Sequence, residues 1–234
     1  MLSVNGFRAA LRYLTMFKEG MICTVSLSFL TVVFGFLLAL VLALMRMSRI
    51  KPLSIFASIY VEVFRATPML VQLFIIYYIV FGGVSLPSFK LFGFIRFERF
   101  LPGVISLALN SAAYLSEIIR AGIQSIDPGQ SEAARSLGLT RRQTLQSIVL
   151  PQAMRTAFPP LSNSLISMVK DTSLAANITV TEMFMVTQRI VARTYEPLLL
   201  YLEVGLIYLI FSTVLTWVQR FGEKKLASYG HKEG

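Results

Sequence analysis

MICTVSLSFLTVVFGFLLALVLALM, Met21 to Met45, is a run without a single charged side chain. It exceeds the roughly 20 apolar residues that an α-helix needs to cross the hydrocarbon core of a bilayer. It is also too long for the apolar core of a signal peptide and has no obvious small-residue cleavage site, so we predict a retained membrane span. Because a backbone in lipid must satisfy its own hydrogen bonds, this run predicts a helical membrane protein.

The composition of the whole chain agrees with a membrane protein. Charged residues make up 15% of the 234 residues, below the roughly 25% of soluble domains, and hydrophobic residues make up 55%. The net charge is +10, and the basic residues flank the apolar runs without forming an extended basic face. This pattern indicates loops and headgroup contacts rather than a nucleic-acid partner. Cys23 and His231 are the only residues of their types, which excludes an intrachain disulfide and a His/Cys metal cluster.

Four further apolar runs extend the prediction to five spans and an all-α, polytopic membrane bundle. One of them contains Pro159 and Pro160, which are expected to break its helix. The freed carbonyls would need protein or a water-filled cavity, which favours a translocation path near Ser162 to Ser164, with a packing kink as the alternative. The predicted spans after the first are Ala66–Phe89, Leu101–Ser116, Thr156–Val169 and Val204–Gln219.

The same pattern divides the chain into a lead-in at 1–19, a transmembrane domain at 20–220 and a tail at 221–234. The lead-in is either an amphipathic interfacial helix or a solvated segment. Five spans place the two ends of the chain on opposite sides of the membrane. A small excess of Lys and Arg in the loops near Gln130 predicts that this region and the carboxyl end are cytoplasmic. Gly82–Gly103, rich in Gly and Pro, is expected to be an external loop.

QSEAARSLGLTRRQTLQSIVLPQA, Gln130 to Ala153, is a polar stretch in the middle of this apolar chain. Just ahead of it, Asp127 and Pro128 predict the N-cap and the first residue of a helix, where the missing N–H of proline costs nothing. Gly138 is predicted to end this helix in the left-handed conformation. The stretch therefore begins with a short helix outside the membrane.

A second short helix is predicted to follow after a tight turn. Thr140 and Gln143 have the spacing of a capping box, which restarts a helix. We expect this helix to run to Leu150 and to stop or bend at Pro151. On pattern alone, such a pair is expected to pack on the membrane helices of its own chain. The apolar stripes of the two helices are Ala133, Ala134 and Leu137, and Leu145, Ile148 and Val149.

The residues themselves shift that expectation. EAARSLGLTRRQTLQSIVLP resembles the EAA loop, the signature of ABC-transporter membrane subunits: Glu-Ala-Ala, a glycine four residues after the second alanine, and a distant Ile-x-Leu-Pro. The resemblance implies that the two helices dock into a groove of a separate ATPase subunit and transmit its closure to the spans. The positions that it assigns to ATPase coupling are Glu132, Ala133, Ala134, Gly138, Ile148, Leu150 and Pro151.

Three further segments narrow the branch of the family. FRATPMLVQLF, Phe64 to Phe74, resembles the Arg-Gly-Thr-Pro segment of permeases for polar amino acids, with Ala66 in place of the usual glycine. PPLSNSLISMVKDTSLAANI resembles the same branch, and RTYEPLLLYLEVGLIYLI is similar to its cystine-transporting members. The resemblance covers about Gly20 to Gln219. It implies a type I ABC importer permease of the bacterial cytoplasmic membrane, with L-cystine or a related amino acid as substrate.

The resemblance also implies partners. The sequence contains no G-x-x-x-x-G-K-[ST] phosphate loop, so ATP and Mg are expected on a separate ATPase subunit, and this chain is expected to be neither an enzyme nor a cofactor-binding protein. Two copies of the chain, or this chain and a related permease, would form the path. An extracytoplasmic amino-acid-binding protein would deliver the substrate. The alternatives are a stand-alone secondary amino-acid carrier, which usually shows internal repeats, and a membrane-embedded enzyme.

Polar side chains within the predicted spans are costly in lipid unless they face a cavity or a partner. Glu62 and Arg65 are spaced to form an ion pair on one helix. The stripe from Asn110 through Tyr114 either lines a pathway or bonds a neighbouring helix. An amino acid needs a carboxylate for its ammonium group and donors for its carboxylate, although Lys170 and Asp171 can also neutralise each other. The predicted substrate-path residues are Glu62, Arg65, Asn110, Glu117, Asn163, Lys170 and Asp171.

Overall fold

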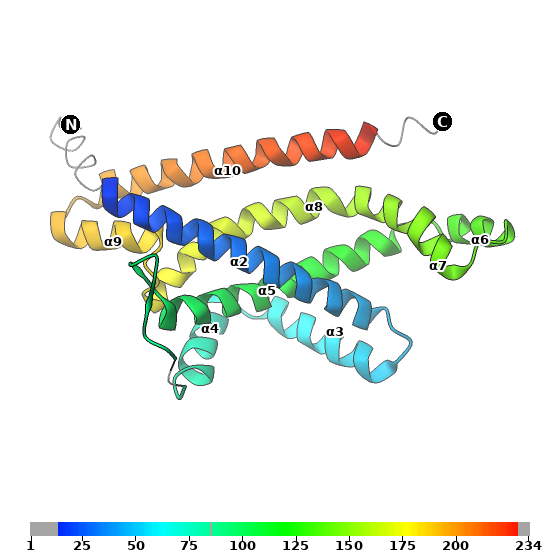
Figure 1. Ribbon diagram of the computed structural model, residues 1–234, viewed down its shortest axis with the longest axis horizontal. Coiled ribbons are helices and arrows are strands. Elements are labelled where there is room, and N and C mark those ends of the chain that lie inside the picture. Colours follow the sequence, from blue (N-terminus) through cyan, green and yellow to red (C-terminus); the bar gives the residue numbers. More distant parts are fainter. Residues whose placement is uncertain (1–13, 85, 229–234) are drawn as a thin grey trace.

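The computed structural model of the chain describes residues 14–84 and 86–228. Residues 1–13 of the predicted lead-in and 229–234 of the predicted tail lie outside the described residues. The described chain forms an elongated bundle of helices (Figure 1), which confirms the predicted all-α membrane fold. The α-helices are α2 (Leu14–Arg46), α3 (Lys51–Ala66), α4 (Met69–Phe74), α5 (Phe97–Gln124), α6 (Pro128–Ser136), α7 (Arg141–Thr144), α8 (Leu150–Asp171), α9 (Met183–Thr194) and α10 (Pro197–Ser228). The shorter elements are the π-helical segments η1 (Ile75–Val80) and η2 (Leu145–Val149), the 3-10 segment η3 (Thr172–Ile178), and the antiparallel strands β1 (Lys90–Leu91) and β2 (Ile95–Arg96).

Within the described residues, three helices are long and apolar enough to cross a membrane, and a bent pair adds a fourth if it counts as one span. The three occupy Phe17–Arg46, Phe97–Gln124 and Pro197–Lys225, and they contain the first, third and fifth predicted spans. The bent pair joins α3 to the helix formed by α4 and η1 at an angle of 110°. α8 contains the fourth predicted span but does not qualify by its own hydropathy. The predicted count of five is therefore above what the helices support by length and composition.

The second predicted span, Ala66–Phe89, has the wrong bounds. Helix α3 ends at Ala66 because Pro68 pushes the preceding residue, Thr67, into an extended conformation with φ of −112° and ψ of 146°. A new helix begins at Met69 and continues through η1 to Val80. The predicted external loop is also shorter than expected, because α5 already begins at Phe97.

Pro159 and Pro160 do not break α8, contrary to the prediction, because the helix is continuous from Leu150 to Asp171. Each proline lacks the N–H that would bond the carbonyl four residues earlier. Helix α8 nevertheless packs along both α5 and α10. At Gly122 of α5, an added Cβ would lie only 2.8 Å from Ala157 Cβ, so the two helices touch just before the prolines. This tertiary packing outweighs the local tendency of the prolines to end the helix.

Helices α2 and α5 cross at the centre of the bundle and share its most extensive contact (Figure 1). Leu27 and Ala39 of α2 and Leu107 and Leu115 of α5 are buried along this crossing. Helices α6 and α7 lie at one end of the bundle, the α6–α7 end, and α9 lies at the opposite end, the α9 end (Figure 1). The central crossing therefore connects the two ends of the bundle.

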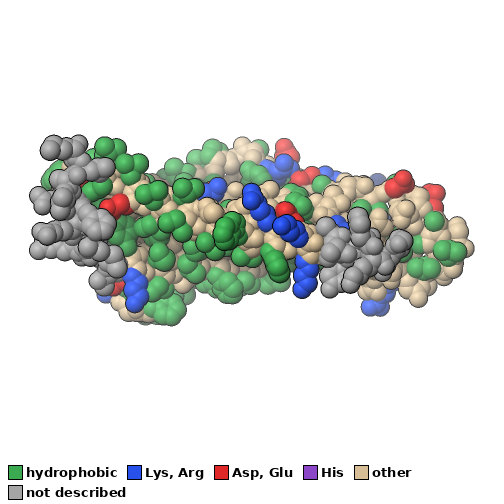
Figure 2. Space-filling model, turned by 90° about the horizontal axis from the view of Figure 1, so that it is seen from above, with side chains coloured by type: hydrophobic (Ala, Val, Ile, Leu, Met, Phe, Trp, Pro, Cys, Tyr) green, Lys and Arg blue, Asp and Glu red, His purple; other side chains and the backbone are tan. Residues whose placement is uncertain are grey.

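Helix α10 lies along the edge of the bundle and buries little of its apolar surface. Only 11% of its most apolar stretch is buried, and Leu206, Trp217 and Phe221 are among its exposed side chains. Figure 2 shows the α10 side, with hydrophobic side chains over the left and centre and charged ones more frequent toward the α6–α7 end. Such a face suits acyl chains in the membrane and polar headgroups or solvent at one end.

Candidate functional site

The start of α6, the turn after it and the start of α7 lie where the sequence predicts them. Asp127 caps α6 by accepting a backbone N–H at 2.7 Å, and Pro128 is the first residue of the helix. Gly138 has a φ of 86°, which is the left-handed conformation expected of it. Thr140 and Gln143 form the capping box, with Thr140 N donating to Gln143 Oε1 at 2.9 Å. Short-range signals therefore determine the shape of this unit.

The helix does not stop at Pro151, because α7 continues through η2 into α8, and Pro151 lies in the first turn of α8. The predicted alternative, a bend at Pro151, stays a prediction. The π-helical segment η2 has a wider ladder, in which Leu150 N donates to Leu145 O. This wider turn relieves the clash between the proline ring and the preceding carbonyls, so the helix does not end. Helix α7 is thereby continuous with α8.

The seven positions that match the EAA signature lie mostly at the surface. Glu132, Ala133, Gly138 and Pro151 are exposed, Ile148 and Leu150 are half-buried, and Ala134 is buried. Leu137 at the end of α6 is 82% exposed. Leu137 therefore does not pack on the spans of its own chain within the described residues.

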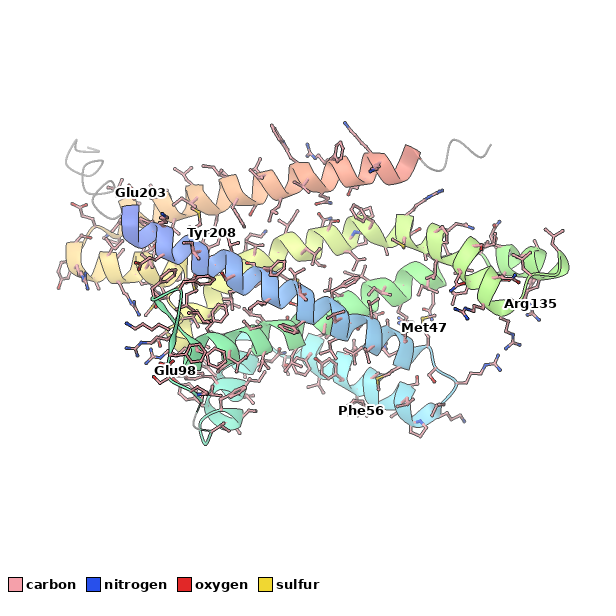
Figure 3. The ribbon with its side chains drawn as sticks, in the orientation of Figure 1. Met47, Phe56, Glu98, Arg135, Glu203 and Tyr208 are labelled. Carbon is pink, nitrogen blue, oxygen red and sulfur yellow. The ribbon has the colours of Figure 1, made fainter. Side chains whose placement is uncertain are left out.

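A cavity of about 400 Å³ lies between α5 and α8, and it has the size of a small-molecule site. Figure 3 shows these two helices side by side through the middle of the molecule. The cavity has amide, hydroxyl and carboxylate groups together with a few apolar side chains. Its lining residues are Met69, Asn110, Ser111, Tyr114, Leu115, Asn163, Ser164, Ser167, Met168 and Asp171. Three predicted path residues, Asn110, Asn163 and Asp171, are therefore brought together.

Gln72 of α4 is a buried amide that the sequence reasoning missed. Its Nε2 donates to Phe64 O at 2.8 Å and to Thr67 O at 3.0 Å, which satisfies carbonyls freed by the helix break before Pro68. Its Oε1 accepts from Asn110 Nδ2 at 2.8 Å, so the same side chain orients a cavity residue. The available signal was an amide shortly after a proline in an uncharged run.

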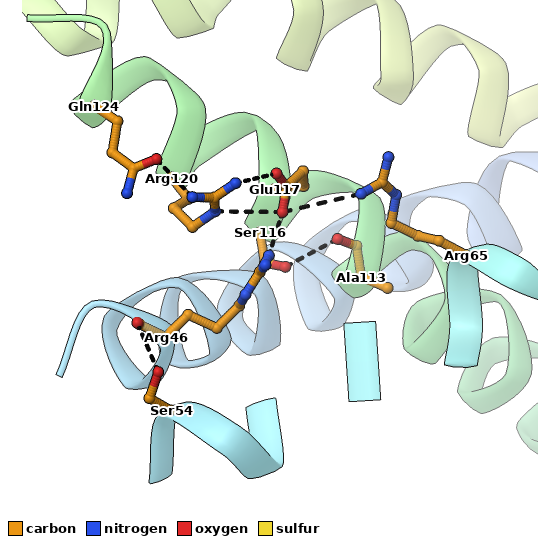
Figure 4. Close-up of polar contacts among 8 residues, drawn as sticks. All are labelled: Arg46, Ser54, Arg65, Ala113, Ser116, Glu117, Arg120 and Gln124. Atoms are coloured by element: carbon orange, nitrogen blue, oxygen red, sulfur yellow. Dashed lines mark hydrogen bonds and ion pairs between the residues drawn. The ribbon is translucent and has the colours of Figure 1, made fainter. Parts of the chain in front are cut away.

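Glu117 does not line the cavity, because arginines from three helices surround its carboxylate (Figure 4). Arg46 of α2 and Arg120 of α5 both bind it directly, and Arg65 Nη1 of α3 lies 3.9 Å from Glu117 Oε2. The predicted Glu62–Arg65 pair is wrong: Glu62 is exposed and forms no ion pair within the described residues. The Arg65 guanidinium instead lies 5.7 Å from the ring centroid of Tyr114. The cluster fastens α2, α3 and α5 together.

Lys170 and Asp171 face different surroundings although they are adjacent in sequence. Asp171 lines the α5–α8 cavity, whereas Lys170 lines a separate cavity of about 290 Å³ toward α9 and α10, beside Tyr201 and Tyr208. No ion pair joins the two side chains in the part of the chain that the structure describes. The two charged residues at the end of α8 are therefore divided between two environments.

Glu182, which the sequence reasoning also missed, is fully buried at the start of α9. Its carboxylate caps α9 by accepting from Phe184 N at 2.9 Å and Met185 N at 2.7 Å, and Tyr208 donates its hydroxyl at 3.0 Å. Burial raises the pKa of Glu182 to about 7, against the lowering effect of these hydrogen bonds. The group connects α9 to α10 and has a structural role.

Four arginines lie close to one another at the α9 end: Arg96 of β2, Arg99 of α5, and Arg189 and Arg193 of α9. Partial burial and the positive charges of the other three lower the pKa of Arg189. None of the four forms an ion pair within residues 14–84 and 86–228. This end therefore presents an uncompensated positive charge.

Comparisons with known proteins agree along nearly the whole chain. The family model for the inner membrane component of binding-protein-dependent transport systems matches residues 31–228. The L-cystine transport system permease protein TcyB of Bacillus subtilis (strain 168) is 44% identical over 211 residues, which cover 90% of this chain and 86% of that protein. The nopaline transport system permease protein NocM of Agrobacterium fabrum (strain C58) is 40% identical over 195 residues, which cover 82% of this chain and 80% of that protein. A chain in the crystal structure of an amino acid ABC transporter with histidines has a TM-score of 0.83 and 38% identity, with 94% of this chain and 98% of that chain covered.

Proposed function

The chain belongs to the inner-membrane permeases of binding-protein-dependent ABC importers for polar amino acids, and on that premise we propose that its substrate is L-cystine or a closely related amino acid. It is a multi-pass transport subunit and not an enzyme, and in this family a separate ATPase subunit binds ATP. Membership of this family sets aside the stand-alone carrier and the membrane-embedded enzyme. The sequence identity of this chain to the cystine permease, 44%, is close to its identity to the nopaline permease, 40%. The choice between substrates therefore rests on the side chains that line the cavity.

The chemistry of the α5–α8 cavity supports this choice. Asp171 supplies a carboxylate for an ammonium group, and the amide of Asn163 supplies donors for a carboxylate. The amide N–H groups of Asn110 donate to Phe64 O and Gln72 Oε1, which leaves its carbonyl oxygen as a further acceptor for the ammonium group. Met69 and Met168 add thioethers, whose polarizable sulfur suits the disulfide at the centre of cystine. No lysine or arginine is among the lining residues. We therefore assign the substrate path to Asn110, Asn163 and Asp171.

The Glu117 cluster has a different role in this proposal. Glu117 lies two helical turns along α5 from Asn110, toward the α6–α7 end. Its contacts to Arg46, Arg65 and Arg120 join α2, α3 and α5 on the side of the cavity that faces the α6–α7 end. We assign Glu117 and Arg65 to closure of the path at that end, where any opening requires these contacts to separate. Glu62 and Lys170 lie outside the cavity and have no part in it.

Coupling to ATP follows from the continuity of α7 with α8. The unit formed by α6, Gly138 and α7 would dock into the ATPase, and its movement would pass through η2 into α8, which lines the cavity. A second permease subunit, either a copy of this chain or a related one, would close the open side of the path. The arginines at the α9 end offer a complementary surface to an acidic face of the binding protein.

The proposal is tested by transport kinetics of the reconstituted transporter, with the ATPase and binding protein present. Asp171→Asn removes the charge that would hold the ammonium group, and it is expected to raise the KM for L-cystine by roughly 10- to 100-fold, as the loss of a charged hydrogen bond implies. Lys170→Gln is the matched control, because it changes the adjacent charge in the separate cavity. Equal KM values for Asp171→Asn and the wild type, or equal effects of the two substitutions, would overturn the assignment.

A further inference from the structure

A second cleft, of about 490 Å³, lies between the α6–α7 unit and the adjoining ends of α2 and α5. It shares no lining residue with the α5–α8 cavity. One part of its wall is basic, with arginines from three separate segments. Another part is apolar, with side chains from the end of α5 and from η2. The residues that matter here are Arg49, Arg135, Arg141, Ile123, Ile126 and Leu145.

The positive charge in this cleft is not neutralised by the described part of the protein. Arg49 follows α2, Arg135 belongs to α6 and Arg141 to α7, and no acidic residue is among the lining residues. None of the three arginines takes part in an ion pair within the described residues. Figure 3 labels Arg135 among the short helices at this end. All three arginines are exposed, so water solvates them in the free protein, and their shared positive potential attracts an anion to the cleft.

The position of the cleft along the bundle indicates which anion. The candidate spans of α2 and α5 end at Arg46 and Gln124, and the cleft is lined by Arg49 and Ile126, just beyond those ends. The cleft therefore lies beside the ends of these two candidate spans, where a lipid headgroup next to the spans would reach it. The α6–α7 end faces the cytoplasm if this unit docks the ATPase, as proposed above. The cytoplasmic leaflet carries the anionic lipids that attract basic residues next to a span.

We infer that this cleft binds the phosphate of an anionic phospholipid. The guanidinium groups of Arg49, Arg135 and Arg141 donate to the phosphate oxygens, as arginine does in bidentate contacts. Ile123, Ile126 and Leu145 contact the glycerol and the first carbons of an acyl chain. This apolar wall favours a lipid over inorganic phosphate. The bound lipid joins the α2–α3 loop to the coupling unit, so it sets how firmly α6 and α7 are held against the spans.

The test compares lipid binding by two triple variants of the full-length permease. The cleft variant carries Arg49→Gln, Arg135→Gln and Arg141→Gln, which remove the three positive charges from the lining of the cleft. The outside variant carries Lys51→Gln, Arg142→Gln and Arg155→Gln, which remove the same number of positive charges from residues that do not line the cleft. Each protein is placed in nanodiscs of phosphatidylcholine with phosphatidylglycerol, extracted into detergent, and examined by native mass spectrometry for retained phosphatidylglycerol. No ATPase or cystine is present, so failure here is distinguishable from failure of the proposed function.

The wild type and the outside variant are expected to retain phosphatidylglycerol, and the cleft variant to bind it at least about tenfold more weakly, as loss of hydrogen bonds to a charged group implies. Three results would overturn the inference. The outside variant could lose as much lipid as the cleft variant, which would indicate general surface attraction. Inorganic phosphate could displace the lipid, which would indicate a site for free phosphate. Lastly, the cleft variant could retain as much phosphatidylglycerol as the wild type, which would show that the three arginines do not hold the lipid.

Discussion

Replacing Gly138 tests the coupling unit where its geometry is most demanding. Gly138 has a φ of 86°, and an added Cβ would meet nothing within 4 Å. The cost of a side chain is therefore conformational and not steric. An L-residue in the left-handed region is disfavoured by roughly 1–2 kcal/mol, and a β-branched residue is the least tolerated there. For Gly138→Val we expect the turn between α6 and α7 to open, which lowers the population of the docking-competent unit by a factor of about 5–30.

The assay is the affinity of the purified permease, held in nanodiscs, for its ATPase subunit. Gly138→Val is expected to weaken this affinity by the same factor and to lower ATP-driven uptake, while the membrane fold stays intact. Gly138→Asn is the matched control, because asparagine visits the left-handed region more readily than other residues with a side chain. The reasoning is refuted if Gly138→Val binds the ATPase as tightly as the wild type, or if both variants lose affinity equally.

Two further predictions concern stability, measured as the midpoint of thermal unfolding in detergent. Because burial raises the pKa of Glu182 from its ordinary value of 4.5 to about 7, the folded protein binds this proton more tightly than the unfolded chain. This stabilisation of about 3 kcal/mol is fully present below about pH 4.5 and is lost as the pH rises through about 7. Glu182→Ala should remove this pH dependence of the unfolding midpoint. Parallel pH profiles of the wild type and the variant would contradict the prediction. Gln72→Leu removes the hydrogen bonds to Asn110 and to the carbonyl of Thr67. Because both groups are accessible to solvent, the stability should fall by about 0.5–1.5 kcal/mol for each hydrogen bond lost. Val71→Leu is the control for Gln72→Leu because Val71 is exposed, and an equal loss in both variants would show that the buried amide is not the cause.

The coupling unit could be predicted closely from the sequence because its signals are local. Asp127, Gly138 and the Thr140–Gln143 box each act within a few residues, and the structure confirms all of them. The all-α membrane class follows from uncharged runs such as Met21–Met45, which need no knowledge of the neighbouring helices. Local chemistry is sufficient in these cases because the partner groups are supplied by the same segment.

The errors arise where tertiary contacts decide. Pro159 and Pro160 remain helical because α8 is packed between α5 and α10, which no local pattern reveals. The expected partner of Arg65 was on its own helix, but the carboxylate that it approaches belongs to Glu117, on α5. Glu182 and Gln72 were missed for the same reason, since their roles depend on groups from other elements. Pro68 signals the helix break directly, but the uncharged run around it favours a span that begins at Ala66.

The central claim is that this chain forms an ATP-driven path for L-cystine. The most direct measurement is uptake of labelled L-cystine by vesicles that contain the permease with its ATPase and binding protein. The account predicts accumulation that requires hydrolysable ATP, stops when the ATPase is left out, and is competed by unlabelled L-cystine. Accumulation by the permease alone without ATP, or ATP-driven uptake of another amino acid with none of cystine, would contradict it.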